Sequence, residues 1–235
     1  MTSAIDFGKI EFERSKRAKQ IRVRIFPNGL KVSLPYGSTE EHALKFIHSA
    51  QDSILAKQKK LHKNEQNNKT ILDEEHEFKT LTFNVLLSRK ARKDIFFSLK
   101  NGILTIEFPE SADCKSEEVQ AHFWNGINYF LRKEAKRLLP DRTKQLAKDF
   151  GFTYSTVKIQ SSKSRWGSCS REKSINLSLY LMLLPSYLID YVILHELCHT
   201  KEMNHGDKFW KWMDKVTDNK SKELRKELKN YNMPK

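Results

Sequence analysis

One short segment of the chain has residue types with the spacing of a metal site. His195 and His199 lie four residues apart, so on a helix both imidazoles project from one face, one turn apart. Two such imidazoles can hold one metal ion at ~2.0–2.1 Å from each nitrogen. Glu196 lies on the adjoining flank of that helix, where its carboxylate can reach a water on the ion without being a ligand. This HExxH spacing is typical of metal-assisted hydrolysis and predicts Glu196 as a catalytic residue.

The third ligand of such a site has two candidates. His205 lies further along the chain, within the turn-like sequence Asn204-His205-Gly206, which could bring the backbone towards the metal again. Three His ligands and one water would complete an open, catalytic zinc site. Glu202 would share the face of His195 if the helix continued that far. We favour His205 because a turn positions its side chain more freely. The remaining interpretation of His205 is an ordinary surface residue.

Two other side chains near this segment have a chemical and a structural interpretation. The guanidinium of Arg165 could stabilise an oxyanion or bind a substrate phosphate, or it could anchor its loop, with Trp166 in the core. Cys198 lies about 100° from His199 around a helix, so we expect a buried apolar residue there rather than a thiol ligand. Four further residues with helical spacing are expected to pack behind the site: Phe209, Trp210, Trp212 and Met213.

The elements that must position this segment follow from the hydrophobic pattern of the second half. An apolar stretch from 187 to about 200 predicts the helix that carries the two histidines. Two strand-like pieces, 157–160 and 175–179, precede it and are joined through Ser164–Cys169. A last amphipathic helix is predicted over 220–228.

The first half is dominated by hairpin signals. Apolar and polar residues alternate over 21–25 and 30–34 around a Pro-Asn-Gly turn, which predicts a β-hairpin. A second hairpin is predicted from 78–87 and 95–108, with Asn101-Gly102 at a later turn. The basic run Ser88–Lys93 between these strands is interpreted as a solvated loop or, alternatively, as a phosphate contact. We find no internal repeat in the sequence.

Helices are predicted between and after these strands. Ser38 and Glu41 suit a capping box that opens a helix, which fades into a polar linker over 62–69. A second helical pattern runs over 116–139 and is interrupted at Pro140. Strands are therefore concentrated early and helices late, which predicts an α+β fold. We divide the chain into a β-hairpin-rich region, 1–115, and a metal-binding region, 116–235.

Composition indicates the kind of partner and the cellular compartment to expect. The 43 basic and 29 acidic residues leave a net charge of +14, which favours anionic partners such as nucleic acid or nucleotides. Three cysteines without a CxxC pair predict a reducing compartment. The longest apolar stretch, 177–194, is interrupted by Ser, Pro and Asp, so no membrane span is predicted. The start of the chain shows no signal peptide. We therefore expect a cytoplasmic protein.

Several short segments of the second half form a recognisable set: Ser164-Arg-Trp-Gly-Ser-Cys169, Leu184-Pro185, Leu188-Ile-Asp-Tyr191, His195-Glu-Leu-Cys-His199, Asn204-His205 and Phe209-Trp210. With these segments the chain resembles the YgjP-like metal-dependent hydrolases. These are zincin relatives that are usually classed as metallopeptidases and are akin to the SprT-like proteases. The resemblance implies a zincin-like catalytic domain, in one family domain covering most of the chain. It also implies zinc on His195, His199 and His205, with Glu196 as the catalytic glutamate. The metzincin form HExxHxxGxxH is not met, because position 202 is not Gly.

Three functions are consistent with these observations. The first is a zinc-dependent hydrolase, a metallopeptidase that acts on a peptide through a zinc-bound water activated by Glu196. The second is a metal-dependent nucleoside triphosphate pyrophosphatase, an activity also attributed within the resembled family, with Arg165 or Lys163 holding phosphate. The third is a basic nucleic-acid-binding module with a structural zinc. Structural zinc sites are usually closed by four protein ligands and rich in Cys, which favours the first two.

Overall fold

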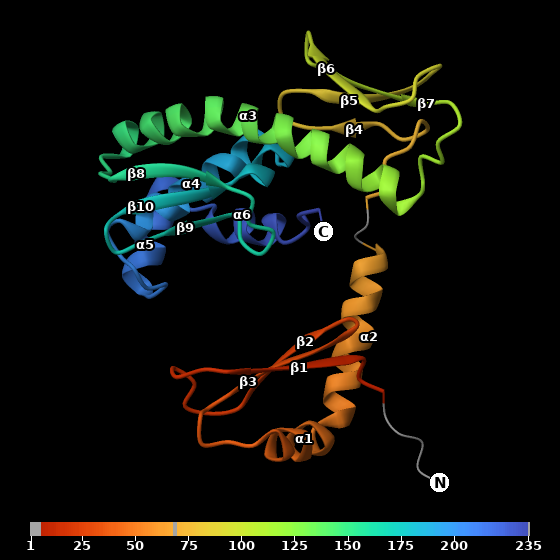
Figure 1. The fold of residues 1–235 in the computed structure, drawn as a ribbon. Coiled ribbons are helices and arrows are strands. Elements are labelled where there is room, and N and C mark those ends of the chain that lie inside the picture. Colours follow the sequence, from red (N-terminus) through yellow and green to blue (C-terminus); the bar gives the residue numbers. More distant parts are fainter. Residues whose placement is uncertain (1–5, 68–69, 235) are drawn as a thin grey trace. The chain divides into compact units, whose positions relative to one another are not determined.

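The computed structural model describes residues 6–67 and 70–234. The chain has the predicted mixed α+β composition and divides into two compact units, Met1–Lys69 and Thr70–Lys235 (Figure 1). The sequence-based division between 115 and 116 falls inside the second unit. The reason is that the sheet formed before residue 115 packs on the long helix that follows it and belongs to the same hydrophobic core.

The first unit is a three-stranded sheet with two helices. Its strands are β1 (Lys9–Arg14), β2 (Arg22–Phe26) and β3 (Gly29–Leu34), in the order β1-β3-β2. The predicted hairpin is confirmed as the antiparallel pair of β2 and β3. Strand β1, which the sequence analysis did not identify, pairs parallel to β3. The helices are α1 (Glu40–Ser49) and α2 (Gln51–Asn67).

These two helices differ from their predicted form. The N-cap is Thr39 rather than Ser38, and its hydroxyl accepts a hydrogen bond of 3.3 Å from the backbone N–H three residues later. The chain then breaks its helix at Ala50 and resumes it as α2. The predicted polar linker is helical as far as Asn67, because Lys, Gln and Glu residues favour a helix. The rest of the predicted linker, 68–69, lies outside the described residues.

A small hydrophobic core holds the first unit together. Alternate residues of β3 (Leu30, Val32 and Leu34) point to one side of the sheet and are buried. Ala43 and Ile47, one turn apart on α1, are buried in the same cluster. Apolar residues recur at every second position on β3 and about once a turn on α1, so each element presents one apolar face to the same core.

The second unit begins with a four-stranded sheet. Its strands are β4 (Phe78–Lys79), β5 (Asn84–Lys90), β6 (Phe96–Lys100) and β7 (Ile103–Pro109), in the order β4-β5-β7-β6. The predicted pairing of the second hairpin was wrong. It is β6 and β7 that form a hairpin, around the Asn101-Gly102 turn, while β5 runs parallel to β7. Strand β6 follows β5 in the chain but does not pair with it, because β7 lies between the two.

The strand arrangement of the first unit recurs in the second, although the sequence showed no repeat. In both β1-β2-β3 and β5-β6-β7, the first strand is parallel to the third and the second is antiparallel to it. Each first strand also carries an arginine, Arg14 or Arg89, that donates to two carbonyl oxygens after the third strand. The acceptors are Tyr36 and Ser38 (both 3.3 Å) for Arg14, and Glu110 and Ala112 (3.0 and 3.1 Å) for Arg89.

Helix α3 (Glu117–Phe150) is the longest element that the structure describes, at 34 residues. The predicted interruption at Pro140 was wrong, because the helix continues through it. Buried residues on both sides of the proline, including Leu139 and Leu146, pack into one core and offset the lost backbone hydrogen bond. The helix ends at Gly151 in a left-handed conformation, with φ of 69°.

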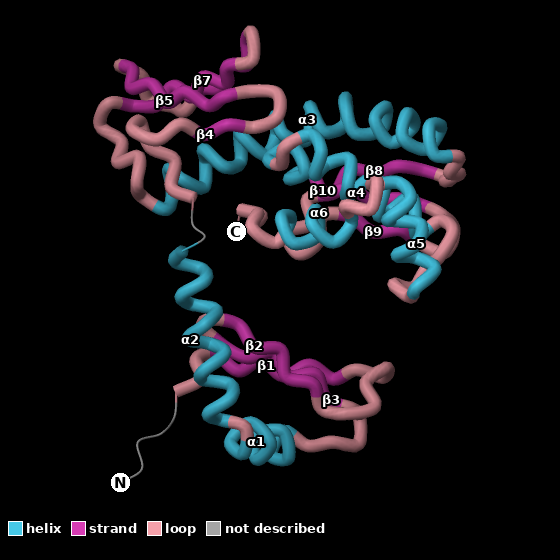
Figure 2. The backbone as a smooth tube through the Cα atoms, turned by 180° about the vertical axis from the view of Figure 1, so that it is seen from behind, coloured by secondary structure: helices cyan, strands magenta, loops and turns pink. Residues whose placement is uncertain are grey.

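Both halves of the second unit pack on α3. The sheet β4–β7 covers its N-terminal half (Figures 1 and 2). The rings of Phe108 on β7 and Phe123 on α3 lie 5.3 Å apart there. A second sheet, in the order β8-β10-β9, lies along its C-terminal half and contains β8 (Thr156–Gln160), β9 (Gly167–Cys169) and β10 (Ser174–Ser178). Strand β9 pairs antiparallel to β10 and is an edge strand.

A 3-10 helix and three α-helices complete the second unit. They are η1 (Leu179–Leu183), α4 (Ser186–His199), α5 (Asp207–Val216) and α6 (Ser221–Leu228). Helix α4 lies where a helix was predicted over 187 to about 200, and α6 lies within the predicted last helix, 220–228. Among the described residues, the helices are too short or too polar to cross a membrane.

Candidate metal centre

Helix α4 positions His195 and Glu196 from inside the hydrophobic core. Residues on all sides of this helix are buried, among them Leu188, Ile193 and Leu197. A helix that is apolar all round must be surrounded by other elements. The HExxH segment therefore ends a core helix, and its polar side chains are held in an apolar setting.

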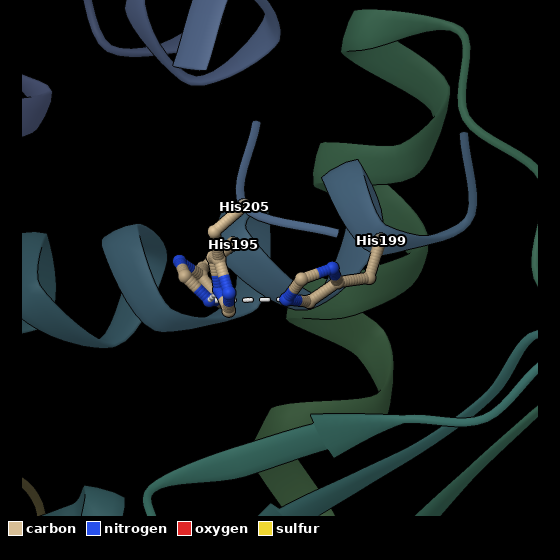
Figure 3. Close-up of side chains that lie close together, drawn as sticks. All are labelled: His195, His199 and His205. Atoms are coloured by element: carbon tan, nitrogen blue, oxygen red, sulfur yellow. Dashed lines mark hydrogen bonds between the residues drawn. The ribbon is translucent and has the colours of Figure 1, made fainter. Parts of the chain in front are cut away.

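The three histidines predicted as ligands come together (Figure 3). Nε2 of His195 lies 3.2 Å from Nε2 of His199 and 3.0 Å from Nε2 of His205. A tetrahedral zinc ion with ~2.0–2.1 Å bonds spaces its ligand atoms about 3.3 Å apart. The three nitrogens therefore have nearly the spacing of three ligands of one ion.

The competing third ligand, Glu202, is not part of this group. Helix α4 ends at His199, so the side chain of Glu202 does not continue the helical face of His195. Instead, the backbone of Glu202 contributes, because its carbonyl oxygen lies 3.1 Å from Nδ1 of His199. With Nδ1–H donating to this carbonyl, the lone pair of Nε2 is free to face the centre of the triad.

Aromatic side chains from α5 support the triad. The ring of Phe209 lies 4.5 to 4.9 Å from the rings of all three histidines and stacks on that of His199. Phe209 is fully buried, as predicted for packing behind the site. Nε1 of Trp210 donates a 3.1 Å hydrogen bond to the carbonyl oxygen of His205, which anchors the loop that carries this histidine.

The protonation states of His195 and His199 suit a cation. Burial, and after it the neighbouring His199 and His205, lower the pKa of His195 to about 3. Burial also lowers the pKa of His199. Neutral imidazoles are the form that binds metal. The donor set therefore fits a zinc ion.

Glu196 is a buried carboxyl group with an unused oxygen. Its side chain is 4% exposed, and Oε2 has no hydrogen-bond partner among the described residues. Burial raises the pKa of Glu196 to about 8, although the positive charge of Arg165 opposes this rise. A carboxyl group with a pKa near neutrality can both accept and donate a proton at physiological pH.

Gly167 on the edge strand β9 makes room for this carboxyl group. A Cβ atom at position 167 would lie 2.6 Å from Oε1 of Glu196 and 2.7 Å from its Cγ. Any other residue would have to displace the glutamate. Gly167 lies in the Ser164–Cys169 segment, where a glycine within a short strand is the only sequence signal for this role.

Two roles were considered for the segment that contains Arg165 and Trp166: binding of the substrate and anchoring of the loop. The Arg165 side chain is exposed and lies close enough to Glu196 for its charge to act on that carboxyl group. The Trp166 side chain packs against the core, and its carbonyl oxygen accepts a 2.8 Å hydrogen bond from the backbone of Ser178. Trp166 therefore anchors the segment, and Arg165 is left free at the site.

Cys169 and Cys198 do not belong to the group of possible metal ligands that His195, His199 and His205 form. Cys198 is fully buried, and burial raises its pKa to about 12, in agreement with the predicted role as a small apolar residue. Cys169 is half-buried, and burial raises its pKa to about 11. Both thiols are therefore protonated at neutral pH and are poor nucleophiles.

Comparison with known proteins gives the family. The family model of the YgjP-like metallopeptidase domain matches residues 19–231, and the chain belongs to this family. The match includes residues of both compact units. The chain is a metal-dependent hydrolase of the metallopeptidase type. A search of curated proteins gives no match.

Solved structures similar to the chain include two archaeal metallopeptidase zymogens. Abylysin from Pyrococcus abyssi is 24% identical, with a TM-score of 0.35, and the alignment covers 37% of this chain and 89% of abylysin. Jannalysin from Methanocaldococcus jannaschii is 26% identical, with a TM-score of 0.35, and the alignment covers 38% of this chain and 92% of jannalysin.

Proposed function

We propose that this protein is a zinc-dependent metallopeptidase in which His195, His199 and His205 hold the metal and Glu196 is the catalytic base. The observation that carries the proposal is the approach of three imidazole nitrogens beside a buried carboxyl group. Nε2 of His199 and Nε2 of His205 both lie within 3.2 Å of Nε2 of His195. Membership of the YgjP-like family supports a catalytic metal and a peptide substrate.

The chain's own residues then have defined tasks. When bound, zinc supplies a Lewis acid that polarises the scissile carbonyl and lowers the pKa of water. Glu196 accepts a proton from the attacking water and delivers it to the leaving amine. Gly167 leaves the space in which this carboxyl group sits. Arg165, exposed beside it, stabilises the negative charge that develops on the substrate oxygen.

The substitution Glu196→Gln tests this assignment. The variant keeps the size of the side chain but cannot move a proton, so it should retain zinc and lose about 10²–10⁴-fold in kcat. Zinc content is measured by elemental analysis and kcat on a casein digest. Wild-type turnover by a variant with verified zinc content would contradict the role of Glu196.

A nucleoside triphosphate is the alternative substrate. The exposed guanidinium of Arg165 near Glu196 favours it, since a planar fork of donors suits phosphate. A panel of nucleotides assayed beside the casein digest separates the two substrates. Release of phosphate or pyrophosphate without peptide cleavage would decide for the nucleotide. A purely structural zinc at the triad is disfavoured, because the group formed by His195, His199 and His205 offers three ligands rather than four.

We also propose that the enzyme works in the reducing environment of the cytoplasm. Its three cysteines (Cys114, Cys169 and Cys198) are all free. Proteins of oxidising compartments commonly pair their cysteines. Fractionation of cells that express the tagged protein would test the location.

A further inference from the structure

The open edge of the first unit's sheet carries a depression of about 620 Å³. It follows strand β2, which lies at the edge of the order β1-β3-β2 and therefore has no neighbour on one side. Residues before β2, on β2 itself and on α2 contribute to its lining. All of them belong to one compact unit, so the depression is a feature of that unit alone.

This depression is strongly basic. Arg17, Arg22, Arg24 and Lys57 line it, and the lining contains no Asp or Glu. All four side chains are exposed. Among the side chains that the structure describes, none of these four takes part in an ion pair with a carboxylate. We refer to these four residues as the basic edge.

The recurring strand arrangement shows that such an edge need not be basic. In the second unit, Arg92 follows β5 as Arg17 follows β1, but Arg92 is paired with Asp94 at 3.1 Å and with Glu107 at 2.7 Å. Glu107 stands on β7 at the position that Ser33 occupies on β3, opposite the first residue of the hairpin partner. The second unit therefore neutralises its arginine internally, whereas the first unit has a serine at the matching position.

Strand geometry arranges the basic edge in a row. Arg22, Arg24 and Phe26 alternate with less exposed residues and so project from the same side of β2. Successive side chains on one side of a strand are roughly 6.6 Å apart. This distance is comparable to the separation of neighbouring phosphates along an extended nucleic acid strand. The Phe26 ring is 44% exposed and is therefore accessible to a ligand.

We propose that the basic edge binds the phosphate backbone of single-stranded nucleic acid, and that Phe26 stacks on an unpaired base. Arginine binds phosphate through two parallel hydrogen bonds, and an exposed aromatic ring beside such cations is the usual platform for unpaired bases. An acidic peptide would use the cations but would leave the ring without a role. A duplex would not present a base face to the ring.

The test uses the full-length protein and a fluorescein-labelled oligodeoxythymidylate, with binding followed by anisotropy over a range of salt concentrations. For single strands, each phosphate contact contributes about 0.7 to the slope of log K against log salt. The double variant Arg22→Gln, Arg24→Gln should therefore lower this slope by about 1.4. Phe26→Ala should lower affinity about tenfold and leave the slope unchanged, because stacking releases no counterion.

Two further variants distinguish binding at the basic edge from binding that depends only on the net charge of the protein. Ser33→Glu places a carboxylate at the position of Glu107 and should weaken binding and lower the slope. The control Lys136→Gln, Lys144→Gln removes two charges from exposed positions of α3 and should change neither quantity. Unchanged thermal unfolding verifies that each variant is folded.

Three outcomes would overturn the proposal. One is a control variant that lowers the slope as much as the Arg22, Arg24 variant does. Another is Phe26→Ala with the affinity of the wild type. The third is competition by polyglutamate, or by vesicles of anionic phospholipid, that matches competition by unlabelled oligonucleotide at equal charge concentration.

Discussion

Gly167 and Glu196 approach so closely that a side chain at 167 would overlap the glutamate: a Cβ atom there would lie 2.6 Å from Oε1. The edge strand β9 and the helix α4 therefore meet across a glycine at the carboxyl group of Glu196. Because this contact is so close, the position of the proposed base depends on Gly167, a residue with no functional group in its side chain.

Gly167→Ala should accordingly impair catalysis while leaving the metal in place. The added methyl group displaces the Glu196 carboxyl, and a misplacement of about 1 Å can cost on the order of 10²-fold in rate. The measurements are kcat and zinc content. Gly37→Ala is the matched control, because a Cβ atom at position 37 meets nothing within 4 Å. Normal kcat in Gly167→Ala would show that the carboxyl group has room to move without loss.

The two candidates for the third ligand can be compared directly. His205→Ala removes an imidazole that lies 3.0 Å from His195, and should weaken zinc binding at least 10–100-fold, which is the cost of losing only a supporting partner. Glu202→Ala keeps the backbone carbonyl that faces His199 and should bind zinc normally. Competition with a chromogenic chelator measures both affinities. Loss of zinc from Glu202→Ala alone would move the third ligand to Glu202.

Pro140→Ala should stabilise the second unit. Pro140 lies inside the continuous helix α3, where it removes one backbone hydrogen bond and crowds the preceding turn. Alanine restores the donor, so the free energy of unfolding should rise by about 1–3 kcal/mol. Urea unfolding followed by circular dichroism measures the change. A fall in stability would mean that the proline ring contributes packing that alanine cannot replace.

The Asp73 carboxylate should make stability depend on pH in the acid range. Its Oδ1 lies 2.8 Å from Nδ1 of His76 and also accepts the backbone N–H groups of Glu75 and His76. The side-chain hydrogen bond from His76 is the largest cause that lowers the Asp73 pKa below its ordinary value of 3.8. A depressed pKa means that the stabilisation is fully present above pH 3.8 and is lost as the pH falls through the folded value.

Asp73→Asn should therefore flatten the acid side of the stability profile, measured as urea midpoints from neutral to acid pH. His76→Ala should flatten it in part, because the backbone donors to Asp73 remain. A profile identical to that of the wild type would show that this turn is equally ordered in the folded and unfolded chains. The turn also groups Asp73, Glu75 and His76 within metal-binding distance, but these hydrogen bonds already occupy Oδ1 of Asp73.

Features that depend on neighbouring residues were predictable from the sequence. The spacing of His195 and His199 placed both on one helical face, and the structure has that helix. The turn residues before His205 suggested the loop that brings this side chain to the other two. The hairpin of β2 and β3 followed from alternation around a short turn.

Features that depend on distant residues were not predictable in this way. The parallel pairing of β5 with β7 joins strands separated by β6, and a turn signal cannot report such a pair. The continuity of α3 through Pro140 depends on burial along both halves of the helix, which overrides the local preference. The space at Gly167 exists only because β9 packs on α4.

The triad is drawn from a single short stretch of chain, His195 to His205, and this has a consequence for chain entropy. The cost of bringing two points of a chain together grows with the logarithm of the loop between them, so a short loop is cheap to close. The imidazoles can therefore converge on an ion before the distant strands have assembled. Burial of Glu196, by contrast, must wait for β9 to dock on α4. We therefore expect the proposed metal site and the proposed catalytic base to form in separate steps of folding.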